Sequence, residues 1–118
     1  MTSSPSDQQQ NRVFLTGATG FVGARLAECL TAAYGLEVHA LVRRIGTVGT
    51  ARLARLPGVR MFYGDICDRD AVMSAANGCH RIIHCATGTS GTSLEQEEAT
   101  VDGTRNVLDA AVTLGAER

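Results

Sequence analysis

The sequence predicts an α/β fold in which a parallel sheet carries helices on both faces. Short apolar runs alternate with helical patterns, four of each along the chain. A glycine-rich turn joins the first apolar run to the first helix. The chain has 118 residues, 44% of them hydrophobic, which is enough for the core of one domain. Right-handed crossovers then give the sheet the strand order 3-2-1-4.

The first half of the chain contains two of these units. Residues 1–11 are polar and are expected to form a disordered leader, because they cannot bury apolar area. Arg12–Thr16 is a short apolar strand that stops at glycine. Glu37–Val42 is a second strand, and Gly49–Leu56 is a weak helix stopped by a Pro-Gly pair. The helix between them, Gly20–Ala33, has an apolar face made of Val22, Leu26, Cys29, Leu30 and Ala33.

The second half repeats the alternation. Arg60–Tyr63 is the third strand, and Asp68 can cap a helix that runs to about Ala76. Arg81–Cys85 is the fourth strand, and the last helix covers Leu94–Leu114. Steps of 3, 4 and 3 residues on this helix predict an apolar stripe of Val101, Thr104, Leu108 and Ala111.

Composition and charge exclude several classes of protein. The net charge of −1 argues against a strongly basic nucleic-acid binder and against a polybasic membrane patch. No apolar run approaches the ~20 residues of a membrane span, and the N-terminus lacks the regions of a signal peptide. We therefore expect a cytoplasmic protein with reduced thiols, used as small apolar residues, at Cys29, Cys67, Cys79 and Cys85.

The turn at Thr16–Gly23 is the most informative segment and reads G-x-x-G-x-x-G from its first glycine. Gly17 allows a tight turn out of the strand, Gly20 lets a pyrophosphate approach the backbone, and Gly23 lets the helix lie close to the sheet. The helix N-terminus offers unpaired N–H groups to the anion. The Lys-Ser/Thr ending of an ATPase P-loop is missing. The alternative is a turn that only packs the helix on the strand.

The stretch T-G-A-T-G-F-V-G-A-R-L resembles the opening of the extended and atypical short-chain dehydrogenase/reductases. That group includes NAD(P)-dependent epimerase/dehydratases and dihydroflavonol-reductase-like enzymes. Later pieces match in order: A-L-V-R at strand two, G-D after strand three, H-C-A-T at strand four and V-D-G-T-R-N-V-L-D-A-A in the last helix. The resemblance implies that residues 12–118 are the N-terminal portion of a Rossmann-type NAD(P)-binding domain.

The resemblance also implies roles for individual residues. The glycine turn would hold the pyrophosphate through Gly17, Thr19, Gly20, Phe21, Val22 and Gly23. Asp65 would hydrogen-bond the amino group of adenine, and Ile66 would lie on the ring. Residues after strand four would follow the adenosine ribose toward the nicotinamide: Cys85, Ala86 and Thr87.

The residues after strand two indicate which dinucleotide binds. An NAD site needs a carboxylate there to hold the ribose 2′-OH, whereas this chain has Arg43 and Arg44. A guanidinium can bind a 2′-phosphate through two hydrogen bonds. We therefore expect NADP rather than NAD, with Arg43 as the favoured contact. The alternative is a pair of solvated loop arginines.

The segment Cys79–Cys85 raises the question of a metal or a catalytic base. Strand alternation puts its two cysteines on one side and His80 and His84 on the other, so one extended segment cannot surround a zinc ion and no metal is expected. His84 would be a general base or a structural residue beside the cofactor, and the resemblance favours the structural role. The loop Ala86–Ser93 would either touch substrate or be a flexible surface loop.

The catalytic pair of the resembled family is absent from this sequence. Those enzymes move a proton through Tyr-x-x-x-Lys, but this chain has Tyr34 and Tyr63 and no lysine. We expect the cofactor-binding part of a reductase or epimerase/dehydratase, truncated before strand five and inactive alone. Its open strand edge would pair with a missing half or with another chain. The alternative is a non-catalytic NADP sensor, and a Tyr-x-x-x-Lys encoded beyond Arg118 would favour the enzyme.

Overall fold

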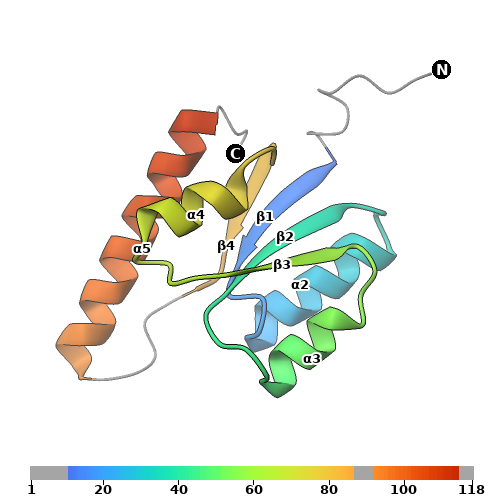
Figure 1. Cartoon of the computed structure of the whole chain (residues 1–118), viewed down its shortest axis with the longest axis horizontal. Helices are drawn as coiled ribbons and strands as arrows, with labels where there is room; N and C mark the ends of the chain where they lie inside the picture. The colour runs from blue at the N-terminus through green and yellow to red at the C-terminus, as the bar shows by residue number, and fades with distance from the viewer. Residues whose placement is uncertain (1–10, 87–91, 115–118) are drawn as a thin grey trace.

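A parallel sheet lies between two pairs of helices (Figure 1). The computed structural model describes residues 11–86 and 92–114. Its strands are β1 (Arg12–Thr16), β2 (Glu37–Val42), β3 (Val59–Tyr63) and β4 (Arg81–His84). Its helices are α2 (Phe21–Ala32), α3 (Val48–Ala54), α4 (Arg69–Ala76) and α5 (Ser93–Leu114). The strand order β3-β2-β1-β4, with every pair parallel, confirms the predicted topology.

Alternation along the strands produces two cores, one on each face of the sheet. On β1, Phe14 faces α4 and α5, whereas Leu15 faces α2 and α3. The α4–α5 side contains Phe14, Leu41, Val72, Ala75, Ala76, Cys79, Val107 and Ala110. The α2–α3 side contains Leu15, Ala18, Ala27, Val38, Ala40, Val42 and Leu53. Figure 1 shows the two helix pairs on opposite faces of the sheet.

The predicted bounds need small corrections. β4 ends at His84 rather than Cys85, and β3 begins one residue earlier than predicted. α3 begins at Val48 because Thr47 caps it, its hydroxyl oxygen accepting the Thr50 N–H at 3.1 Å. The predicted leader lies outside the described residues apart from Asn11.

The face that α2 buries differs from the predicted stripe. Gly23 and Ala27 are buried, whereas Val22 and Cys29 are exposed. A Cβ on Gly23 would lie only 1.9 Å from the carbonyl oxygen of Gly17. The helix therefore turns its smallest side chains toward the turn and the sheet, because larger ones would hold it away.

The last helix shows the same difference. α5 buries Gly103, Val107 and Ala110, whereas Val101 and Leu108 from the predicted stripe are 48% and 60% exposed. A Cβ on Gly103 would lie 2.9 Å from the side chain of Ile66, in the loop after β3. The close approach of α5 to this loop again requires that the helix bury the face with its small residues.

The four cysteines differ in burial, and Cys85 is intermediate. Cys79 is buried, and burial raises the pKa of its thiol to about 12, as expected for a cysteine used as an apolar residue. Cys29 and Cys67 are exposed, so the prediction that they serve as small apolar residues is wrong. In the described residues, no helix combines the length and the apolar character that crossing a bilayer needs.

Candidate functional site

A cleft of about 830 Å³ lies at the carboxyl ends of the strands, where such sheets bind their ligands. Four loops far apart in the sequence form it, one after each strand. It is lined by nine of the predicted site residues: Gly17, Thr19, Gly20, Arg43, Arg44, Asp65, Ile66, Cys85 and Ala86. Thr87 and most of the predicted loop from Ala86 to Ser93 lie outside the described residues.

The glycine turn forms one wall of the cleft. Gly17 has a φ of +72°, and a Cβ there would lie 2.7 Å from the Ala86 nitrogen, so both backbone and space require glycine. Gly20 donates its N–H to the Gly17 carbonyl at 3.0 Å. Among the described residues outside its own chain neighbours, a Cβ on Gly20 would meet that carbonyl oxygen alone, at 3.3 Å. Gly20 therefore keeps open the space where a ligand would approach the backbone.

Three predicted residues lie beside the cleft without lining it. Gly23 is buried, while the side chains of Phe21 and Val22 are 87% and 60% exposed. As first residues of α2, Phe21 and Val22 have N–H groups without an intrahelical acceptor. Their contribution as amide donors stays a prediction.

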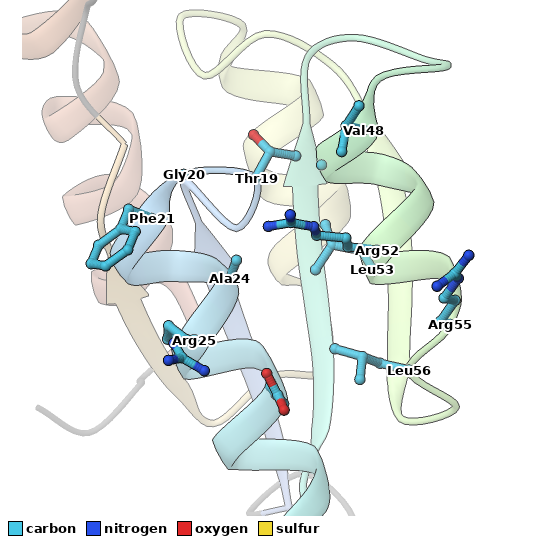
Figure 2. A pocket seen from close by; sticks show the side chains of 12 residues that line it. Thr19, Gly20, Phe21, Ala24, Arg25, Val48, Arg52, Leu53, Arg55 and Leu56 are labelled. Atoms are coloured by element: carbon cyan, nitrogen blue, oxygen red, sulfur yellow. The ribbon is translucent and has the colours of Figure 1, made fainter.

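A second hollow, a groove of about 810 Å³, runs between α2 and α3 (Figure 2). It shares Thr19, Gly20, Val48 and Gly49 with the cleft and is also lined by Arg25, Arg52 and Arg55. Figure 2 shows Arg52 reaching from α3 toward α2. The groove is lined mainly by α2 and α3, whereas the cleft is lined by residues at the ends of all four strands, so the cleft is the candidate binding site.

A hydrogen-bonded chain holds the residues after β4. The hydroxyl oxygen of Thr16 accepts the N–H groups of Cys85 and Ala86, each at 3.1 Å, and lies 2.6 Å from Nδ1 of His84. With two donors on its oxygen, the Thr16 hydroxyl donates to Nδ1. The Nε2–H of His84 then donates to the Thr104 hydroxyl at 3.1 Å. This assignment follows from the partners and makes the ring neutral.

Burial favours the same neutral form by lowering the pKa of His84. Both ring nitrogens are used inside the protein, and His84 does not line the cleft. The geometry supports the structural role over the general base. Thr16, by contrast, lines the cleft and was missed, although it opens the glycine motif.

The loop after β3 forms the opposite wall. The Asp65 carboxylate accepts the Cys67 N–H at 2.9 Å, and its carbonyl accepts the Asp68 N–H at 2.9 Å. Ile66 is partly buried against the α4–α5 core. The two hydrogen bonds that Asp65 accepts therefore order this loop internally. Partial burial, and then the neighbouring Asp65 carboxylate, raise the pKa of the Cys67 thiol.

The arginines that follow β2 line the cleft beside this loop. Arg43 and Arg44 are exposed, and Asp65 is the one carboxylate among the residues that line the cleft. The Gly64 N–H donates to the Val42 carbonyl at 2.9 Å and joins the two loops at their bases. The region after β2 is therefore positively charged.

Sequence reasoning missed other residues of the cleft besides Thr16. They are Leu41, Val42, Thr47, Val48, Gly49, Gly64, Cys67 and Ala99. Thr47 carried a signal, because a threonine two residues before a predicted helix is a candidate cap. Gly49 approaches the glycine turn, where its Cβ would lie 2.8 Å from the Thr19 side chain. That contact joins distant segments and has no local signature.

The segment Cys79–Cys85 shows no metal site. Across the part of the chain that the structure describes, no three His, Cys, Asp or Glu side chains are grouped to hold an ion. Cys79 lies against α4, with its sulfur 4.0 Å from the Ala75 carbonyl oxygen, whereas His84 contacts α5 through Thr104.

Known proteins resemble this chain over nearly its whole length. It is 31% identical to cinnamoyl-CoA reductase 2 of Medicago truncatula, over 99% of this chain and 35% of that protein. It is 37% identical to a putative dihydroflavonol 4-reductase of Synechocystis, over 89% of this chain and 30% of that protein. The crystal structure of vestitone reductase from alfalfa superposes with a TM-score of 0.69 at 29% identity, over 89% of this chain and 33% of that one.

The chain spans about a third of the length of the curated relatives it matches. The family model described as the NAD dependent epimerase/dehydratase family matches residues 13–118, which is most of the sequence. This match agrees with the five motifs and the strand order, and the chain belongs to the NAD dependent epimerase/dehydratase family.

Proposed function

We propose that the chain forms the NADP-binding part of a reductase that moves hydride to or from a carbonyl or alcohol carbon. The observation that carries this proposal is the cleft, which joins the glycine turn, the arginine pair and the Asp65 loop. Relatives named as reductases favour this reaction class over epimerisation.

The glycine turn suits a pyrophosphate. The space in front of Gly20 is open, and the first turn of α2 presents N–H groups and the positive end of the helix dipole. Gly17 lies close to Ala86, so the proposed pyrophosphate site is next to the residues that follow β4. These two features would place the dinucleotide across the strand ends.

The arginines after β2 suit a 2′-phosphate. Arg43 stands where an NAD-binding site has a carboxylate, and its guanidinium can form paired hydrogen bonds with a phosphate. Asp65 and Ile66 would receive the adenine on the neighbouring wall. Cys85 and Ala86 would continue the site toward the nicotinamide, with Thr87 following them in the sequence.

Binding and orientation are the chemistry that this chain itself supplies. NADP supplies the hydride donor or acceptor when it is bound. Proton transfer needs another group, and the chain has no lysine and no Tyr-x-x-x-Lys pair. We therefore expect the 118-residue chain to show no NADPH-dependent turnover of carbonyl compounds. Measurable turnover would contradict this assignment.

A non-catalytic NADP sensor is the second candidate, because binding the dinucleotide needs no Tyr-x-x-x-Lys pair and this chain has the cleft without that pair. Such a module would bind the cofactor and change its contacts with a partner. Both candidates need the same dinucleotide site. They differ in whether the whole protein contains the proton-transfer pair.

Cofactor preference tests the proposal. We expect NADPH to bind at least about tenfold more tightly than NADH, since one charge-assisted hydrogen bond accounts for that much affinity. Arg43→Asp should reverse the preference, because a carboxylate repels the 2′-phosphate and can hold a 2′-hydroxyl. Fluorescence titration of both reduced cofactors measures the two dissociation constants.

Arg52→Asp is the matched control, because it makes the same charge change in the α2–α3 groove. It should leave the NADPH/NADH ratio unchanged. Equal affinities of the unaltered chain for the two cofactors would contradict NADP specificity, and no binding of either would contradict the proposed function.

A further inference from the structure

α5 contacts the loop after β3 through two residues that lie one helical turn apart. The side-chain amide of Asn106 donates to the carbonyl oxygen of Ile66 at 2.9 Å. One turn earlier, Gly103 is buried against the same residue, with room for no more than a hydrogen beside the Ile66 side chain. α5 therefore contacts both the main chain and the side chain of Ile66.

The hydrogen bond from Asn106 holds one particular peptide unit. The Ile66 carbonyl and the Cys67 N–H belong to the same planar group and point in opposite directions. The carbonyl accepts from Asn106, while the N–H donates to the Asp65 carboxylate at 2.9 Å. Asn106 and Asp65 thus hold the two ends of one peptide unit.

Besides the packing of Ile66 against the α4–α5 core, other hydrogen bonds hold the two ends of this loop. Gly64 is fixed to β2 by its hydrogen bond to the Val42 carbonyl, and the Asp68 N–H bonds within the loop to Asp65. The Cys67 sulfur lies 3.8 Å from the Ala99 carbonyl oxygen, which is a weak contact. Without Asn106, the Ile66 carbonyl would lose its hydrogen-bond donor, and the peptide unit that orients the Asp65 carboxylate would be held less firmly.

We propose that Asn106 is a positioning residue that sets the Asp65 carboxylate for reading the base of the dinucleotide. This inference rests on the proposed function, in which Asp65 receives adenine. Adenine presents an amino group that donates a hydrogen bond, whereas hypoxanthine presents a carbonyl oxygen at the same place. A carboxylate held in place accepts from the first and repels the second. Asn106 therefore controls base selectivity without touching the base.

Base selectivity gives a readout that a general loss of stability would not change. The dissociation constants of NADPH and of its hypoxanthine analogue are measured for the unaltered chain and for Asn106→Ala. The unaltered chain should prefer NADPH by at least about tenfold, the worth of one charge-assisted hydrogen bond. Asn106→Ala should lower this ratio several-fold, toward the ratio of Asp65→Ala.

Asp109→Ala is the matched control. Asp109 lies one turn beyond Asn106 and contacts Arg69 of α4 at 3.8 Å, so its loss weakens α4–α5 contact without freeing the loop. This variant should keep the selectivity of the unaltered chain. Asn106→Asp provides a second test variant, since it keeps the shape of the side chain and removes the N–H donors.

Hydrogen exchange of the Cys67 amide tests the same contact without a ligand. Exchange at Cys67 should be faster in Asn106→Ala and in Asn106→Asp than in Asp109→Ala. Unchanged exchange and unchanged base selectivity in the Asn106 variants would overturn the positioning role. If the unaltered chain binds neither dinucleotide, both the proposed function and the role of Asp65 in adenine recognition fail. Faster exchange in the Asn106 variants would still show that Asn106 holds this peptide unit.

Discussion

At the scale of single residues, glycines of one turn serve different purposes. Gly23 faces the Gly17 carbonyl so closely that a Cβ would lie 1.9 Å from its oxygen. In the part of the chain that the structure describes, and apart from its own chain neighbours, Gly20 has one atom within 4 Å of its Cβ position, at 3.3 Å. The fold therefore needs Gly23, whereas the proposed ligand needs Gly20.

These two positions can be separated by substitution. Gly20→Val should abolish NADPH binding with a small loss of stability, because its side chain would occupy the place of the pyrophosphate. Gly23→Ala should cost about 1–3 kcal/mol or more, because the added carbon overlaps fixed backbone. Urea denaturation and NADPH titration of both variants measure the two effects. A Gly20→Val chain that is folded and binds normally would show that the turn is only structural.

His84 makes stability depend on pH. Burial lowers its pKa from the ordinary value of 6.5, so the unfolded chain binds the proton more readily than the folded one. The stability that neutral His84 contributes is therefore complete above pH 6.5, and it is lost as the pH falls through the lower pKa of the folded state. We expect the urea concentration at the unfolding midpoint to decrease when the pH is lowered from ~8 to ~5. His84→Gln should make this decrease smaller. An unchanged pH profile in the variant would refute the assignment to His84.

At the scale of elements, the sequence predicted strands better than helix faces. The alternation that defines β1 and β2 is local, and both bounds were correct. The predictions of the buried faces of α2 and α5 were wrong, because these faces depend on how closely each helix approaches other segments. Gly23 and Gly103 mark these faces, yet apolar periodicity gives weight to larger side chains such as Val22 and Leu108.

The candidate site was predictable for a related reason. Gly17, Gly20, Arg43 and Asp65 lie in the turns that follow strands, and the topology brings the ends of parallel strands together. Asn106 was not predictable, because its role depends on a hydrogen bond across 40 residues. Motifs after strands reveal what meets the ligand, but they do not reveal what supports those residues.

The cap of α4 gives a test at this scale. The Asp68 carboxylate accepts the N–H groups of Asp70 and Ala71 at 3.0 and 3.4 Å, as the sequence predicted. Asp68→Ala should lower the free energy of unfolding by about 1 kcal/mol. Asp70→Ala removes a charge from the same turn without removing a cap, so it should cost less. Equal losses in urea denaturation would contradict the capping role.

At the scale of the whole molecule, the sheet has two edges in the described residues, β3 and β4. Within the described ranges β4 pairs with β1 alone, and its Ile82 and Ile83 are partly buried on opposite faces. An unpaired edge of this kind can accept a strand from another chain. We expect the 118-residue chain to associate as its concentration rises, as measured by light scattering. A monomer at every concentration would contradict this expectation.

The central claim is that the cleft at the strand ends binds NADP. Hydrogen–deuterium exchange with mass spectrometry, performed on dilute chain with and without saturating NADPH, tests it most directly. Slower exchange is predicted at residues 17–22, 65–67 and 85–86, with no change at residues 52–56 beside the α2–α3 groove. Protection confined to the groove, or none anywhere, would contradict the claim.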